Sequence, residues 1–321
     1  MNHPALLWHN GHVKPWAQAT THVGAHALHY GSSVCEGVRV YATPRGPAAF
    51  RLADHTRRLF ESARTYEIEI GYSEDEINAA CADVVRANGL TSAYLRPIVF
   101  RGAGGLGVLA SDTDPVEVAV IALQWGAYLG EAAERGADVC VTSWQRPAPN
   151  TLPSWAKAGG NYLSSQLIGM EARRHGYDEG IALGHDGLLS EGAGENLFLV
   201  KHGKLLTPPS SAGILAGITR DSVIALAADL GIAVEERALP REALYNADEV
   251  FMTGTAAEIT PVRSVDRKPI GTGAPGAITQ RLREAFFGLF DGRREDRHGW
   301  LQAIEPAAGT AARSDALEAV A

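Results

Sequence analysis

The 321-residue sequence has few cysteines, no long hydrophobic run and no excess of basic residues, and each shortage excludes a class of protein. Its three cysteines, Cys35, Cys81 and Cys140, are an odd number without metal-ligand spacing. We therefore expect no disulfide scaffold and no metal, and a reducing, cytoplasmic location. Nowhere do about 18 consecutive apolar residues occur, and no basic segment opens an apolar leader, so neither a membrane span nor a secretory signal is expected. The net charge of -8 disfavours nucleic acid and anionic membranes as partners. A small solute is the expected partner.

The chain does contain enough apolar residues for a large core, since 45% of them are hydrophobic. Its length favours two modest domains over one. We place a small N-terminal domain at 1–125 and a large domain at 138–305. A linker is expected at 126–137, where Gly, Ala and Glu displace β-branched residues. The alanine-rich tail at 306–321 is expected to be disordered.

Local patterns in the first 125 residues predict hairpins, helices and long strands. Asn10-Gly11 joins two short apolar runs and suits a tight primed turn, so 6–16 is predicted as a hairpin at a sheet edge. Asp54 is expected to cap a helix that ends near Tyr66, and Ser73 with Glu76 forms a capping box for a second helix. The other expected elements are a hairpin over 38–52, strands over 94–100 and 116–125, and a mobile, glycine-rich substrate loop over 102–107.

The second part of the chain is predicted to mix strands and helices. The helix from Thr219 to Leu230 starts at Gly217-Ile218, where free N–H groups could bind a phosphate. The small-residue turn Gly254-Thr255-Ala256 could also approach an anion. The remaining expected elements are strands over 138–144, 180–183, 188–189, 196–200 and 249–252, and helices over 160–175 and 278–290.

Lys157 is set apart from the other four lysines, which lie beside Pro, Gly or His in turn-like settings. Its neighbours are alanines and a glycine pair, which leave room for a planar ligand close to the backbone. Loss of water around the amine would lower its pKa and free it to form a Schiff base. Taken alone, the octapeptide Trp155–Tyr162 also fits a flexible loop lysine.

A second motif, Ser190-Glu191-Gly192-Ala193-Gly194-Glu195-Asn196-Leu197-Phe198, supplies carboxylates. A pyridine ring that acts as an electron sink needs an acid to keep its nitrogen protonated, and a buried Glu191 could do this. Glu195 is the alternative.

Together, AKAGGNYLSS and SEGAGENLF resemble the aminotransferases of PLP fold type IV, and most closely the bacterial branched-chain amino acid aminotransferases. The resemblance runs from Trp8 to Trp300. It includes HALHYG at 26–31, YLRP at 94–97, GITRD at 217–221 and GTAAEITPV at 254–262. It implies an α/β fold with a smaller N-terminal α/β domain and a larger C-terminal domain with a β-barrel-like core. It also implies pyridoxal 5′-phosphate (PLP) as the cofactor.

The resemblance assigns roles residue by residue. The Schiff base falls on Lys157, the partner of the pyridine nitrogen on Glu191, and a hydrogen bond to the ring hydroxyl oxygen on Tyr162. The phosphate would be bound by Arg58, Ile218, Thr219 and Thr255. The substrate side would comprise Tyr30, Cys35, Tyr94, Arg96, Leu106, Val108, Trp125, Tyr128, Thr255 and Ala256, with Arg96 meeting the glutamate carboxylate and the backbone of Thr255 and Ala256 meeting the α-carboxylate.

The implied activity is PLP-dependent transfer of an amino group between leucine, isoleucine or valine and 2-oxoglutarate, with amino acids and 2-oxo acids as partners. A homodimer is implied, with a hexamer of three dimers as a further assembly. D-amino acid transaminases, (R)-amine transaminases and aminodeoxychorismate lyase share the lysine and glutamate, so they stay alternatives. A catalytically silent PLP-binding or sugar-phosphate-binding protein is the alternative from another class.

Two positions depart from the family pattern. Cys35 stands where the pattern has a bulky phenylalanine beside the substrate, which predicts a roomier pocket. Trp155 stands where a small residue is usual. Its indole could refill the space that Cys35 leaves, so the preferred side chain stays open.

Overall fold

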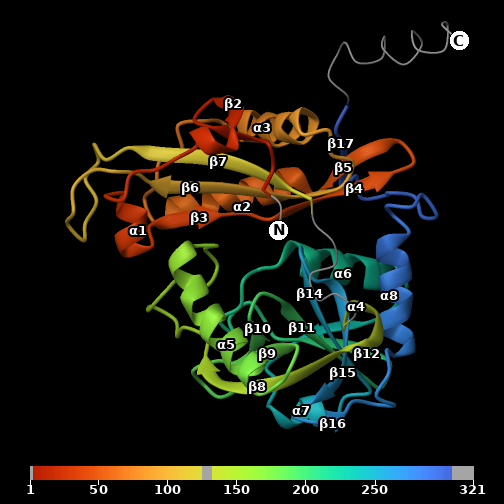
Figure 1. Cartoon of the computed structure of the whole chain (residues 1–321). Helices are drawn as coiled ribbons and strands as arrows, with labels where there is room; N and C mark the ends of the chain where they lie inside the picture. The colour runs from red at the N-terminus through yellow and green to blue at the C-terminus, as the bar shows by residue number, and fades with distance from the viewer. Residues whose placement is uncertain (1–2, 125–131, 306–321) are drawn as a thin grey trace, which may run out of the picture.

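The fold consists of two β-sheets with helices packed against both, as seen in a computed structural model that describes residues 3–124 and 132–305. In Figure 1 one sheet lies above the other. The upper sheet, called the first sheet below, contains strands β1–β7, and the lower one is called the second sheet. Within the described residues the upper sheet has eight strands and the lower sheet nine. The predicted mixed α/β architecture is confirmed. The predicted domain boundaries stay a prediction, as does the mobility of the 102–107 loop.

The first sheet has the order β17-β5-β4-β6-β7-β1-β2, with β3 paired to β6. The β1–β2 hairpin lies at its edge, and both Asn10 and Gly11 have positive φ angles, as the predicted primed turn requires. The strands are β1 (Leu6–His9), β2 (His12–Pro15), β3 (Ser33–Cys35), β4 (Val38–Thr43), β5 (Gly46–Phe50), β6 (Ala93–Arg101), β7 (Val116–Leu123) and β17 (Leu301–Ala303).

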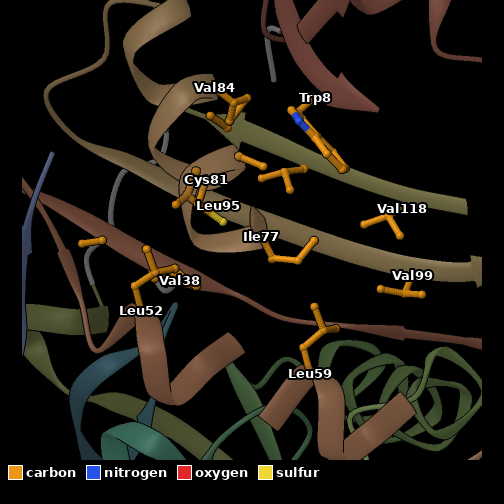
Figure 2. Packing of buried hydrophobic residues seen from close by; sticks show 14 of the residues in the cluster. Trp8, Val38, Leu52, Leu59, Ile77, Cys81, Val84, Leu95, Val99 and Val118 are labelled. Carbon is orange, nitrogen blue, oxygen red and sulfur yellow. The ribbon is translucent and has the colours of Figure 1, made fainter. Parts of the chain in front are cut away.

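Helices α2 (Leu52–Thr65) and α3 (Glu74–Ala87) bury their apolar sides with this sheet. Figure 2 shows Ile77 and Val84 of α3, together with Leu59 of α2, in one cluster with strand residues. All three are fully buried or nearly so, and each contributes about 1.5–3 kcal/mol by leaving water. This core holds α2 rigidly, and α2 carries residues of the site.

The second sheet has the order β10-β9-β8-β15-β14-β11-β12-β13, with β16 on β15. Its strands are β8 (Ala137–Gln145), β9 (Glu179–Leu183), β10 (Leu189–Gly192), β11 (Asn196–Lys201), β12 (Lys204–Thr207), β13 (Val234–Glu236), β14 (Glu249–Gly254), β15 (Glu258–Val265) and β16 (Lys268–Pro269). Helices α5 (Tyr162–Arg174), α6 (Ile218–Asp229) and α8 (Ala277–Phe287) pack against it. Short helices are α1 (His26–Tyr30), α4 (Ala132–Arg135) and α7 (Glu242–Tyr245), with 3₁₀ turns at Trp16–Gln18 and Gly159–Asn161.

Most sequence-predicted elements are confirmed to within a few residues, including the capping box, in which the Ser73 side chain accepts from Glu76 N while the Glu76 carboxylate accepts from Ser73 N. The predicted cap at Asp54 is wrong. Helix α2 begins three residues earlier, at Leu52, and Arg51 is its N-cap, in a left-handed conformation. Asp54 lies in the first turn, where its carboxylate accepts from Arg51 Nε at 2.7 Å. The predicted helix over 278–290 also ends early, at Phe287.

Sequence patterns missed several elements, among them β3, β12, β13, β15, β16 and β17. Strand β17 pairs with β5, so residues 301–303 return to the first sheet. Trp125, Tyr128 and the tail at 306–321 lie outside the described residues. None of the helices in the described ranges combines the length and hydrophobicity needed to cross a membrane.

Candidate functional site

A cavity lies where α2, the start of α6, the end of β14 and strand β10 converge. Its wall includes every predicted cofactor residue: Arg58, Lys157, Tyr162, Glu191, Ile218, Thr219 and Thr255. The structure thus brings together residues that are up to 197 positions apart in sequence, counted from Arg58 to Thr255.

Lys157 is fixed by contacts with the first sheet and its helix. Its backbone N–H donates to Ser62 Oγ at 3.0 Å, and its carbonyl accepts from Cys35 N–H at 3.0 Å. Its amine donates to the Tyr162 hydroxyl. The predicted lowering of its pKa is wrong for the free side chain. Burial does lower the pKa of Lys157, but the neighbouring Tyr162 and Glu36 outweigh burial and raise it.

Glu191 lies on β10 and is only 5% exposed. Its Oε1 is 2.9 Å from Arg146 Nη2, while Oε2 accepts from Leu215 N–H at 3.0 Å and from the Asn196 amide at 3.1 Å. Burial raises the pKa of Glu191, and the Arg146 guanidinium opposes that rise. Arg146 is a cavity residue that sequence reasoning missed, because it follows a strand and precedes Pro147 without any recognisable motif.

Glu195, the alternative carboxylate, also lines the cavity and is buried. Its Oε2 accepts from Gly194 N–H at 3.0 Å. Burial raises the pKa of Glu195 well above its ordinary value, and the nearby Glu179 carboxylate raises it further. Burial likewise raises the pKa of Glu179 to about 7. Glu195 therefore favours its neutral form more than Glu191, which has a guanidinium beside it.

The opposite end of the cavity is suited to a phosphate. Gly217 caps α6 without a side-chain hydrogen bond, so the first N–H groups of this helix face the cavity end. A Cβ at Gly217 would lie 1.9 Å from Asn196 Oδ1, which excludes larger residues here. The buried hydroxyl of Thr253 has no protein partner. Such donors match a phosphate group, and we conclude that the cavity fits PLP.

Arg58 reaches this end of the cavity from α2. Its Nη1 donates to Ala216 O at 2.8 Å, next to the start of α6. Its other contacts are with Glu36, a fully buried carboxylate that sequence reasoning did not single out. Glu36 Oε1 accepts from Arg58 Nε at 2.6 Å, and Oε2 accepts from Nη2 at 2.9 Å.

Three predicted substrate residues form one cluster. Arg96 donates from Nη2 to the Tyr94 hydroxyl at 3.1 Å and from Nη1 toward Cys35 Sγ at 3.7 Å. A Cβ at Gly37 would lie 1.9 Å from the Tyr94 oxygen, so only glycine leaves room for this tyrosine. The cluster lies close enough to Tyr162 and Lys157 to affect the pKa of Lys157 through Cys35.

The other substrate positions are more exposed. The Tyr30 hydroxyl donates to Leu106 O at 2.7 Å, and Val108 is 74% exposed on the same loop. Gly31 approaches Gly160, which places this rim beside the lysine segment. Thr255 lines the cavity, and Ala256 follows it in the turn after β14.

Trp155 lies away from the Cys35 cluster. Its side chain is 63% exposed, and its indole N–H donates to Ser210 O at 3.1 Å. It lines a separate surface hollow with Leu152 and Pro147. Trp155 therefore does not refill the space that Cys35 leaves.

Comparisons with known proteins agree with this geometry. Residues 33–265 match the family model of amino-transferase class IV. The chain is 56% identical to the branched-chain-amino-acid aminotransferase of Escherichia coli strain K12, over 93% of this chain and 97% of that protein. It is 46% identical to the corresponding protein of Pseudomonas aeruginosa, over 94% of this chain and 97% of that protein.

Solved structures of similar fold also belong to branched-chain amino acid aminotransferases. A crystal structure of the Escherichia coli branched-chain amino acid aminotransferase superimposes with a TM-score of 0.93 at 55% identity, covering 94% of this chain and all of that one. The branched-chain amino acid aminotransferase of Thermobaculum terrenum, in its PLP form, gives a TM-score of 0.88 at 36% identity, covering 95% of this chain and all of that one. The predicted fold type is confirmed.

The two carboxylates of the cavity can be distinguished by matched substitutions. We expect Glu191→Gln to lower kcat for transamination by about two orders of magnitude or more, because the amide cannot keep a ring nitrogen protonated. Glu195→Gln should change kcat by less than about tenfold, since Glu195 favours its neutral form already. Steady-state kinetics would measure both, with absorbance spectra to show that Lys157 still binds the cofactor. A larger loss in Glu195→Gln than in Glu191→Gln would reverse the assignment.

Proposed function

The chain belongs to the class IV aminotransferase family, and from this membership we propose that it transfers the amino group between branched-chain L-amino acids and 2-oxoglutarate. One observation carries the proposal: a single cavity holds Lys157 beside Tyr162, Glu191 beside Arg146, and Arg58 at the start of α6. The names of these relatives supply the substrate class. The activity is that of an aminotransferase with PLP as its cofactor.

The cofactor, when bound, supplies an electron sink for the bond to the substrate Cα. Lys157 would hold the cofactor through its amine, and the same amine would move a proton to and from the substrate Cα. Tyr162 positions the amine through its hydroxyl.

Glu191 and Arg58 would fix the two ends of the cofactor ring system. We propose that Glu191 meets the pyridine nitrogen, because its Oε1 and Oε2 are already held in place by Arg146, Asn196 and Leu215. Arg58, the N–H groups of Ile218 and Thr219, and the Thr255 hydroxyl would bind the phosphate.

The substrate side chain would enter beside Tyr94, Arg96 and Cys35. One pocket must accept a branched apolar chain in one half-reaction and the side-chain carboxylate of glutamate in the other. Arg96 would meet that carboxylate, while Tyr30, Leu106 and Val108 would form the rim. Thr255 and Ala256 would bind the α-carboxylate through backbone N–H groups. Trp125 and Tyr128 belong to the same proposal.

A side-by-side substrate panel tests the proposed reaction. Purified enzyme should turn over Leu, Ile and Val with 2-oxoglutarate, in ping-pong fashion, at a kcat/KM at least about 100-fold above that for D-Ala or (R)-1-phenylethylamine, because the proposed substrates are L-amino acids. Lys157→Ala is the inactive control and should form no borohydride-trappable link. Preference for D-Ala or the (R)-amine would assign the chain to another transaminase of the same fold, and no turnover of any substrate would leave a silent PLP-binding protein.

Cys35 is the position at which this pocket should differ from the family pattern. Its side chain is 6% exposed and touches Arg96, and Trp155 lies elsewhere. A thiol fills less volume than a phenyl ring. We therefore propose that bulky substrates fit better here than in relatives with phenylalanine.

We expect Cys35→Phe to lower the ratio of kcat/KM for Phe over that for Val by roughly tenfold, since a methylene of apolar contact changes specificity by about 1–3 kcal/mol. Cys35→Ser keeps the volume and is the matched control, for which the ratio should stay within about twofold. The measurement is steady-state kinetics with both amino acids. An unchanged ratio in Cys35→Phe would show that position 35 does not shape the pocket.

We further propose a homodimer, with a hexamer of three dimers as its larger form. Leu28, Leu106, Val108 and Leu109 are apolar side chains, each at least 64% exposed, next to the substrate rim. A second copy would cover them and complete the site. Light scattering at assay concentration should find no active monomer, and a fully active monomer would contradict the proposal.

The three free, buried cysteines support a cytoplasmic location, which cell fractionation would measure.

A further inference from the structure

We infer that Glu36 is the positioning residue of the phosphate site: it fixes the Arg58 guanidinium against the start of α6 so that the cofactor's phosphate meets a preformed donor. This inference rests on the proposed function, because it takes the phosphate of PLP as the ligand. Glu36 is 0% exposed and lies between β3 and β4, so it touches no substrate. It acts through Arg58.

Four hydrogen bonds hold the Glu36 carboxylate. Two come from Nε and Nη2 of Arg58, at 2.6 and 2.9 Å, and form a bidentate pair. His55 Nδ1 lies 2.6 Å from Oε2, and Gly37 N–H donates to the same oxygen at 3.1 Å. His55 and Arg58 lie three residues apart on α2, so one carboxylate joins two side chains of the same helix face. The carboxylate cannot rotate without losing one of these partners.

This arrangement decides which hydrogens of Arg58 remain for a ligand. A guanidinium has five N–H donors. Glu36 takes two of them, and Ala216 O takes one from Nη1 at 2.8 Å. Ala216 immediately precedes Gly217, the N-cap of α6. The remaining donors of Arg58 are therefore held beside the free N–H groups of α6 before any anion binds.

Charge and geometry make opposite predictions about Glu36. Arg58 and Glu36 carry opposite charges, so the carboxylate makes the cavity less positive. Burial raises the pKa of Glu36, but Arg58 and His55 outweigh burial and hold that pKa well below its ordinary value. If charge dominates, removing the carboxylate should leave a more positive cavity and tighter binding of a phosphate. If positioning dominates, the same change should release a long side chain with several rotatable bonds, and binding should weaken.

Three features favour positioning. The bonds are bidentate and short, so they fix the plane of the guanidinium as well as its place. The side chain carries considerable rotamer entropy, which a preformed site does not lose on binding. Arg58 comes from α2, and the other phosphate donors come from α6 and β14. The phosphate site is therefore complete only when the Arg58 side chain extends from α2 toward the start of α6.

The test measures the affinity of the full-length protein, freed of cofactor, for PLP and for pyridoxal, which lacks the phosphate. For Glu36→Gln we expect the Kd for PLP to rise about 10- to 100-fold, the range that a charge-assisted hydrogen bond supports, while the Kd for pyridoxal changes by less than about twofold. The double variant with Arg58→Gln should bind PLP no more weakly than Arg58→Gln alone, because Glu36 acts through Arg58. Phosphorus NMR of the bound cofactor should shift in the same variants.

Glu36→Asp keeps the charge and shortens the side chain by one methylene, so it should also weaken PLP binding if position matters. It replaces Glu36→Gln as the test if that variant does not fold. Glu249→Gln is the matched control: its carboxylate accepts from Ile278 N, Thr279 N and Thr279 Oγ1, away from the cavity. It should alter stability without altering the Kd for PLP.

Unchanged or tighter PLP binding in Glu36→Gln would overturn the inference. So would an equal loss for PLP and pyridoxal, or additive losses in the double variant. A wild-type protein that binds no PLP would instead overturn the proposed function.

Discussion

The site depends on one contact that joins the lysine segment to the first sheet and its helix α2, made by the backbone of Lys157. Its N–H donates to Ser62 Oγ on α2, and its carbonyl accepts from Cys35 N–H at the end of β3. A bridge between Val34 and Ala158 continues this contact. Val34, Ser62 and Ala158 are all buried, so water cannot easily replace these bonds. Because the lysine segment belongs to the second part of the chain and its partners to the first, neither part alone contains a working site.

Buried charges around this contact are paired. Arg58 pairs with Glu36, Arg146 with Glu191, and Arg39 of β4 with Glu258 of β15. An unpaired ion at such depth would be costly, and a paired one has its orientation fixed. The Arg58 and Arg146 pairs therefore decide where a donor or an acceptor points in the cavity. The Arg39–Glu258 pair also ties the first sheet to the strand that follows the Thr255-Ala256 turn, at 3.3 Å.

The cofactor end and the substrate end of the site differ in how strongly they are determined. The cofactor end is lined by Gly217, where a Cβ would lie 1.9 Å from Asn196 Oδ1, and by Glu191, whose carboxylate has several partners. At the substrate end, Arg96 contacts Tyr94 and Cys35, and the rim at Leu106 and Val108 is open. Substitutions at the substrate end can change specificity while the chemistry of the cofactor end stays the same.

The sequence alone determined the features whose cause lies within a few residues or within a motif. The Asn10-Gly11 turn and the Ser73–Glu76 capping box follow from local backbone chemistry, and the lysine and glutamate motifs identified the family and the fold. Only the tertiary structure decided what surrounds those residues. Arg146 lies 45 positions from Glu191 and Glu36 lies 22 from Arg58, so no local pattern could reveal either pair. The pKa of Lys157 moved in the opposite direction to the prediction, because neighbours that folding alone brings to the amine outweigh its loss of water.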